Sequence, residues 1–214
     1  MDIKNKNLLN LFNKVKLNNE SVSLLVLALL PAIFVTKTIE AVLIYLVIYF
    51  IYLVLSTLVG KLVNKLLDNN NAWIATLIAN ISIATLLSIV FSSILINFGN
   101  EFNIYLYFMT LSSLPYMINE DTKEENVGKS LLNALQSFLG FALLMFIVAL
   151  LREVLGTGMI TFGNYTNLSF SLKLFPKYAM TIFANNFGSL VILGIVLGVF
   201  NLTLQKRGET KWVI

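Results

Sequence analysis

The sequence contains neither cysteine nor histidine in its 214 residues. This excludes disulfides, thiolate metal sites, iron–sulfur ligation by cysteine, haem ligation by histidine, and catalysis by either residue. Charged residues are also scarce, at 12%, whereas an average soluble domain has roughly 25%. Hydrophobic residues make up 57% of the chain, and the mean hydropathy is +0.82. A water-soluble core of this length could not use so much apolar surface, so we expect an integral membrane protein.

Uninterrupted uncharged windows define the candidate spans, since a perpendicular helix needs about 20 apolar residues. There are six such windows, 21–36, 41–60, 69–100, 102–119, 130–151 and 178–205, and all but the first and fourth reach that length. A seventh, 154–172, is rich in Gly, Asn and Thr and is predicted to be an extramembrane loop. We therefore expect one six-span domain over residues 21–207 and a short cytoplasmic tail, 208–214. Residues 1–20 form either a helix in the membrane interface or a disordered basic tail.

The distribution of basic residues gives the orientation. Six spans place both termini on one side, and that side then holds 11 of the 15 Lys and Arg residues. The other side has Lys37, Arg152, Lys173 and Lys177. The positive-inside rule predicts cytoplasmic termini in a plasma-membrane protein. The net charge of +4 does not indicate nucleic-acid binding, because the basic residues lie in short segments between apolar runs.

Two windows are short, and each contains a proline. The first has 16 residues with Leu30, Pro31 and Thr36, and the fourth has 18 with Leu114 and Pro115. Two long windows follow each of them, so the halves 21–100 and 101–207 share one design. Because three spans per half is an odd number, homologous halves are inverted in the membrane. The proline segments are either kinked helices or half-helices whose free backbone groups need partners.

The expected fold is therefore all-α, with six transmembrane segments arranged as an inverted repeat of three plus three. The first and fourth segments are short or half-helices.

A polar pattern, Thr-x-x-Ala-Asn, recurs early in the third and sixth windows. Asparagine inside a membrane helix is expensive unless it finds a partner. These residues are either a polar pair near the repeat axis, on an ion path, or interhelical hydrogen-bonding groups. They are Thr76 and Asn80 in the third window, and Thr181, Asn185 and the adjacent Asn186 in the sixth.

Charges beside the spans admit two interpretations each. Arg152 and Glu153 follow the fifth window, and adjacent helical residues do not face each other, so they do not form a local ion pair. They mark the outer edge of the span or form a functional pair at the mouth of a pathway. The acidic run 119–126 is either a solvated cytoplasmic loop or a contact for a basic partner subunit.

Three stretches resemble a known family. They are "LALLPAIFVT" (27–36), the short window with Pro115, and "ALQSFLGFALLMFIVALLREVLGTGMITF" (134–162). The chain is similar to the Rnf/Nqr integral membrane subunits of the NqrD/NqrE and RnfA/RnfE type, and its "LREVLGTG" stretch to RnfE and NqrD in particular. The resemblance implies six spans as inverted repeats with half-helices first and fourth. It also implies pairing with a homologous subunit of opposite orientation in a redox complex that translocates sodium or protons.

The chain departs from the family at the positions that carry its cofactor. The resemblance implies one cysteine before the proline of the first half-helix and another in the fourth segment, which together with a partner hold an iron–sulfur cluster. Leu30 and Pro115 occupy these positions here, and neither can ligate iron. We therefore expect no cofactor and no metal bound by this chain alone. Either the chain is a divergent member without the cluster, or its redox partner carries electrons differently.

Three functions remain open at this point. The first is a non-catalytic membrane subunit of an Rnf/Nqr-like electron transport complex, acting as scaffold and possible ion path. The second is a small six-span transporter or substrate-binding component that uses half-helix ends to hold a solute or ion. The third is a structural membrane partner with no transport of its own.

Overall fold

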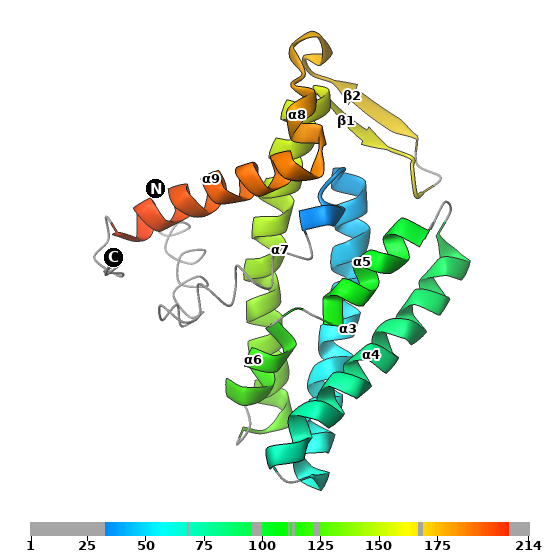
Figure 1. The fold of residues 1–214 in the computed structure, drawn as a ribbon, viewed down its shortest axis with the longest axis vertical. Coiled ribbons are helices and arrows are strands. Elements are labelled where there is room, and N and C mark those ends of the chain that lie inside the picture. The colour runs from blue at the N-terminus through cyan, green and yellow to red at the C-terminus, as the bar shows by residue number, and fades with distance from the viewer. Residues whose placement is uncertain are drawn as a thin grey trace.

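The computed structural model describes residues 33–67, 69–95, 100–110, 112, 114–121, 125–166 and 169–205 (Figure 1). Leu30, Pro31 and the basic segment 1–20 lie outside these residues. The described chain is mostly helical and contains one small sheet. Its elements, in order, are η1 (Ile33–Val35), α3 (Ile39–Leu66), α4 (Asn69–Ile94), α5 (Asn100–Thr110), α6 (Leu114–Asp121), α7 (Val127–Thr157), β1 (Met159–Phe162), β2 (Phe170–Lys173), η2 (Pro176–Tyr178), α8 (Thr181–Ala184) and α9 (Asn186–Gln205).

Three helices in the described part are long and apolar enough to cross a membrane. They are α3, the Ala72–Ile94 part of α4, and α7. Figure 1 shows these helices side by side: α3 runs away from the end that carries the β-hairpin, and α4 and α7 both run back toward that end. We call the end of the bundle that carries β1 and β2 the hairpin end. The fold is therefore that of a membrane-embedded helical protein, as the sequence predicts.

Local signals set the helix boundaries. Thr38 is the N-cap of α3, and its hydroxyl accepts a hydrogen bond from the Ala41 N–H at 3.2 Å. At the far end of α7, Gly158 adopts a left-handed conformation (φ 67°, ψ 11°) that ends the helix. The helix thus extends to Thr157, well beyond the expected window 130–151. Counting only uncharged residues set that boundary too early, because Arg152 and Glu153 are buried inside the helix.

The fourth window is not one helix. It forms α5 and α6, and the chain leaves helical geometry between Thr110 and Leu114. Pro115 is the second residue of α6, a position where a missing N–H is harmless. The proline therefore starts a short helix instead of kinking a long one. Ser112 lies in the break and bonds with the Tyr49 phenol of α3 at 2.9 Å.

The sixth window is also interrupted. Asn185 has extended geometry (φ −75°, ψ 158°) and separates the short α8 from α9. Asparagine favours such helix boundaries because its side chain competes for backbone hydrogen bonds. In Figure 1, α9 crosses α7 near its hairpin end and then projects away from the other helices, not parallel to α7. The described structure thus does not present residues 178–205 as one continuous span.

The window 154–172 is not an irregular loop. After the last residues of α7 it forms an antiparallel hairpin in which Met159 pairs with Lys173 and Phe162 with Phe170. Gly163, at φ 118°, takes the chain out of β1 through a conformation that other residues rarely adopt. The sequence reading as a loop came from its Gly, Asn and Thr content. That content did not indicate the two four-residue strands, β1 and β2, that flank the turn.

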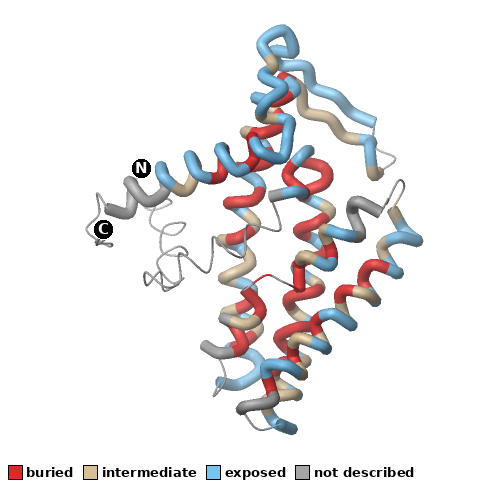
Figure 2. The backbone as a smooth tube through the Cα atoms, in the orientation of Figure 1, coloured by how far each residue is buried: buried red, intermediate tan, exposed pale blue. Residues whose placement is uncertain are grey.

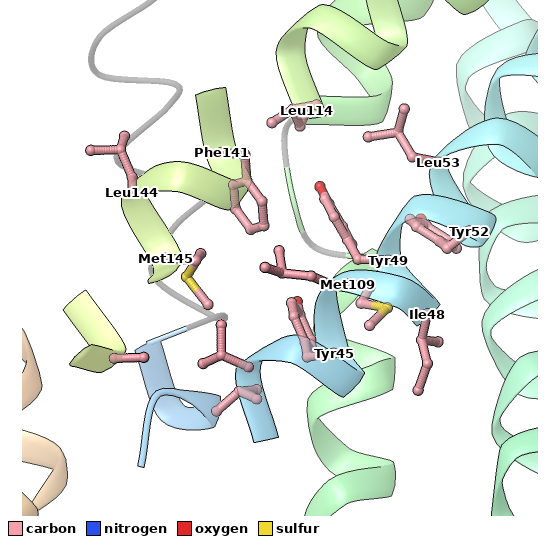
Figure 3. Packing of buried hydrophobic residues seen from close by; sticks show 14 of the residues in the cluster. Tyr45, Ile48, Tyr49, Tyr52, Leu53, Met109, Leu114, Phe141, Leu144 and Met145 are labelled. Carbon is pink, nitrogen blue, oxygen red and sulfur yellow. The ribbon is translucent and has the colours of Figure 1, made fainter. Parts of the chain in front are cut away.

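The core lies between α3 and α7, and the outer helix faces are exposed (Figure 2). Three tyrosines, Tyr45, Tyr49 and Tyr52, stack along one side of α3. Figure 3 shows Tyr45 and Tyr49 facing Met145 and Phe141 of α7, and the Tyr49 and Phe141 ring centroids are 4.7 Å apart. Aromatic rings bury large apolar areas, so this stack is the main contact that positions α7 against α3.

A small residue lets the chain after the hairpin approach α7. A Cβ placed on Gly156 would lie 2.8 Å from the Ala184 backbone nitrogen, so no larger residue fits without a backbone shift. Gly140, on the same helix, has open space in the same position. The two glycines are therefore a matched pair for testing the contact between α7 and α8.

We expect Gly156→Ala to lower the free energy of unfolding by about 1–3 kcal/mol through overpacking. Gly140→Ala should be neutral or stabilising by about 0.5–1 kcal/mol, because alanine is the better helix former. Denaturant titration in mixed micelles measures both. Equal effects from the two substitutions would contradict the close approach of α8.

Candidate functional site

The hairpin end of α7 carries two buried charged residues. Arg152 and Glu153 are each 1% exposed. As neighbours on one helix they point in different directions, and each takes its own partners. The sequence offers two interpretations, a pair that marks the outer edge of the span or a functional pair at the mouth of a pathway. The structure places both side chains inside the protein, where each requires hydrogen-bond partners.

Arg152 binds the break between α8 and α9. Its Nε donates to the Phe183 carbonyl at 3.2 Å, and its Nη2 donates to the Ala184 carbonyl at 3.0 Å. Nη2 also donates to Oδ1 of Asn186 at 3.2 Å. The last carbonyls of a helix have no partner within it, so an interrupted helix needs donors from outside. The forked guanidinium supplies several donors in one plane and suits this task.

The same guanidinium reaches the end of the first window. Nη1 of Arg152 donates to the hydroxyl of Thr36 at 3.0 Å, and Thr36 is fully buried. Thr36 directly follows η1, and η1 also lies against α9. Arg152 lies 116 positions from Thr36 in sequence, and it joins the chain directly after η1 to the break between α8 and α9.

Glu153 binds the start of α3 and the first strand. Its Oε2 accepts from the Ile39 N–H at 2.6 Å, and its Oε1 accepts from the N–H and hydroxyl of Thr161 at 2.7 and 2.9 Å. The first N–H groups of a helix lack internal partners and attract negative charge. Glu153 thus caps α3 from another helix, while Thr38, the residue directly before α3, caps it locally.

Glu40 is a third buried charge, which the sequence reading missed. Its Oε2 accepts from the N–H groups of Gly163 and Asn164, and its Oε1 from the N–H groups of Tyr165 and Thr166 and the Thr166 hydroxyl, at 2.7–3.1 Å. One carboxylate therefore holds the whole start of the hairpin loop. The available signal was an acid in the first turn of a helix, immediately before an uncharged run.

Arg152, Glu153, Glu40 and Thr36 form what we call the hairpin-end joint. It links the chain after the first window, the start of α3, the end of α7, the hairpin and the α8–α9 break. The charges in these contacts face backbone dipoles and hydroxyls of the protein itself. The arrangement fixes several chain segments relative to one another.

The remaining sequence candidates lie elsewhere. Leu114 and Pro115 are buried at the start of α6. Thr76 is buried, and its hydroxyl donates to the carbonyls of Ala72 and Trp73 in its own helix. Asn80 accepts a hydrogen bond from Ser56 of α3 at 2.7 Å.

The two copies of the Thr-x-x-Ala-Asn pattern lie in different surroundings. Thr181 and Asn185 are exposed, and only the adjacent Asn186 joins the hairpin-end joint. Asn80 lies on α4, which Figure 1 shows well apart from α8. The structure therefore brings Thr36, Arg152 and Asn186 together, but it does not bring Asn80 to Asn185.

The contact between Thr36 and Arg152 can be tested with a matched pair of substitutions. Thr36→Val keeps the shape but removes the hydroxyl, and we expect a loss of about 1.5–3 kcal/mol, the usual worth of a hydrogen bond to a charged group. Thr36→Ser keeps the hydroxyl and should retain most of that stability. Unfolding in mixed micelles measures both, and equal losses would show that the methyl group, not the hydroxyl, matters.

Glu40→Gln tests the anchoring of the hairpin loop. The amide group turns a donor toward backbone N–H groups, so we expect a loss of about 1.5–3 kcal/mol and faster hydrogen exchange at residues 163–166. Glu125→Gln is the control, because Glu125 is exposed and its carboxylate accepts from Asn133 in an exposed contact, far from the hairpin loop. Unchanged exchange in the loop of Glu40→Gln would rule out the anchor.

Comparison with known proteins gives one result beyond the geometry. No curated protein matches the chain. A family profile described as "Rnf-Nqr subunit, membrane protein" matches residues 8–200. The match covers all the described helices except the end of α9, and it agrees with the apolar helices of the bundle. The chain therefore belongs to the Rnf-Nqr subunit family of membrane proteins.

Proposed function

We propose that this chain is a scaffold subunit of an Rnf/Nqr-like, ion-translocating electron transport complex. In this proposal it is of the RnfE/NqrD type and lies in the plasma membrane with both termini in the cytoplasm. It pairs there with a homologous six-span subunit of opposite orientation. The observation that carries the proposal is the family match over residues 8–200.

The hairpin-end joint supports a scaffold role. Its charged side chains bind backbone groups of the same protein and so hold several chain segments in fixed positions. A subunit that positions neighbouring subunits needs such a rigid structure. The outward surface of α9 supports the presence of a partner or lipid. Its side chains Phe187, Ile195 and Val199 are each more than half exposed, and in a membrane protein lipid or another subunit covers such groups.

The residues present do not fit the family's iron–sulfur cluster. Such clusters are held by cysteine thiolates, in some cases with histidine, and the chain has neither. No group of three acidic, cysteine or histidine side chains that could hold a metal occurs in the described part. The only hydroxyl described at the α5–α6 break, that of Ser112, already bonds to Tyr49. We therefore derive no electron-transfer step through this chain and propose that it binds no cluster by itself.

A contribution to the ion path belongs to the same proposal. Its support is the buried pair of Ser56 and Asn80, which lies inside the candidate spans α3 and α4. Polar side chains are expensive within a membrane and commonly mark pathways for ions or substrates.

The deciding experiment is copurification of the tagged chain in gentle detergent, with iron and flavin measured in the same sample. We expect a second six-span subunit of this family in the eluate, because the family works in multi-subunit complexes. We also expect iron far below one atom per chain once the chain is isolated, because thiolate and imidazole ligands are absent. An unrelated tagged multi-span protein from the same membranes is the control.

The outcomes separate the parts of the proposal. Repeated recovery of this chain alone would contradict the complex. Stoichiometric iron in the isolated chain would contradict the cluster-free assignment and leave the complex standing. Solute uptake by vesicles that contain only this chain would favour the six-span transporter instead.

A further inference from the structure

Three buried side chains between α3, α4 and α6 carry polar atoms without a hydrogen-bond partner among the described residues. These atoms are Oη of Tyr52, both Oδ1 and Nδ2 of Asn119, and Nδ2 of Asn80, whose side chain lies within interaction distance of the Tyr116 phenol of α6 without well-formed hydrogen-bond geometry. The three residues are 0%, 1% and 7% exposed. Native proteins leave few such groups unsatisfied, because each costs about 1–3 kcal/mol when it is buried without a partner. Their presence in one region therefore needs an explanation.

These side chains form a continuous line along α3. Tyr52, Ser56 and Gly60 follow one another at intervals of four residues and so lie on the same face of the helix. Ser56 donates to Oδ1 of Asn80 at 2.7 Å, which brings α4 to this face. A Cβ on Gly60 would meet the Asn119 amide, so α6 covers the next turn. We call Tyr52, Ser56, Asn80 and Asn119 the polar seam.

Both ends of the polar seam are defined. One turn before Tyr52, Tyr49 bonds with Ser112 at the α5–α6 break. Directly after Gly60, Lys61 donates to the Glu125 carbonyl at 2.9 Å, in an exposed region. The face from Tyr49 to Lys61 spans twelve residues, or about 18 Å of helix. A polar line therefore connects the exposed end of the bundle to the break inside it.

The free atoms select the kind of ligand. The two amide nitrogens are donors, the Asn119 oxygen is an acceptor, and the phenol can act as either. None of the four residues carries a charge. A bare cation cannot bind amide N–H groups, and an anion cannot bind the amide oxygen. Water satisfies donors and acceptors together, and buried water typically makes about three such bonds.

We propose that ordered water occupies the polar seam and bridges Tyr52, Asn80 and Asn119 within the membrane domain. The water exchanges with bulk solvent at the Lys61 end, where Lys61 and Glu125 are at the surface. The proposal does not depend on membership of a redox complex. In this proposal the region between α3, α4 and α6 contains water, whereas the core between α3 and α7 contains none.

The absence of cysteine in the chain gives a direct test. A single introduced thiol yields one S–H stretching band without background, and this band shifts when the thiol exchanges with D2O. The full chain in lipid nanodiscs would be compared as Ser56→Cys and as Ala149→Cys. Ala149 is 0% exposed and lies in the apolar core on α7.

We expect the thiol of Ser56→Cys to exchange at least about tenfold faster than that of Ala149→Cys, because a dry buried group exchanges only when the structure opens locally. Equal, slow exchange at both positions would overturn the proposal.

A second measurement decides the matter even if Ser56→Cys does not fold. Asn119→Leu replaces an amide by an apolar group of similar size. In a wet seam it expels water and leaves Tyr52 and Asn80 without partners, so the melting temperature should fall. In a dry seam it removes two unsatisfied atoms, so the melting temperature should rise, and that result would overturn the proposal. Asn133→Leu, at a partly exposed site on α7, is the control.

Discussion

A buried guanidinium beside an interrupted helix is the interaction on which the hairpin end of this protein depends. Arg152 is almost fully buried, and a charge in that position is costly unless it is surrounded by acceptors. The break after Ala184 frees carbonyls that would be equally costly inside a membrane protein without donors. Each feature satisfies the other. Neither an arginine without the break nor the break without the arginine would be stable at this place.

The two acids of the hairpin-end joint are also satisfied by the backbone, but as negative charges they accept hydrogen bonds from N–H groups. Glu153 accepts from the first N–H of α3, and Glu40 accepts from the backbone of the hairpin loop. In all three cases a full charge is compensated by partial charges of the main chain. The scarce charged residues of the apolar part therefore act on the backbone where its regular hydrogen bonding stops. This explains how a chain with 12% charged residues supports so many interruptions.

Much of the architecture can be read from the sequence, because the membrane imposes a length on apolar helices. The windows 41–60 and 130–151 locate α3 and α7, and the proline in the fourth window signals a break there. The ends are less predictable, because a charge normally marks the end of an apolar span, whereas Arg152 and Glu153 lie inside a helix. Glu40 was passed over because its partners are backbone groups more than 120 residues away. The same holds for the Asn185 break, which depends on a side chain from α7.

Consecutive residues at the start of α3 are held by different elements. The Ile39 N–H is bound by Glu153 of α7, while the Glu40 carboxylate is bound by the loop that follows β1. The N–H groups of the first helical turn point along the helix axis, whereas a side chain projects away from it. The Ile39 contact therefore opposes sliding of α3 along its axis, and the Glu40 contacts oppose its rotation about that axis. Together they tie the start of α3 to both α7 and the hairpin loop.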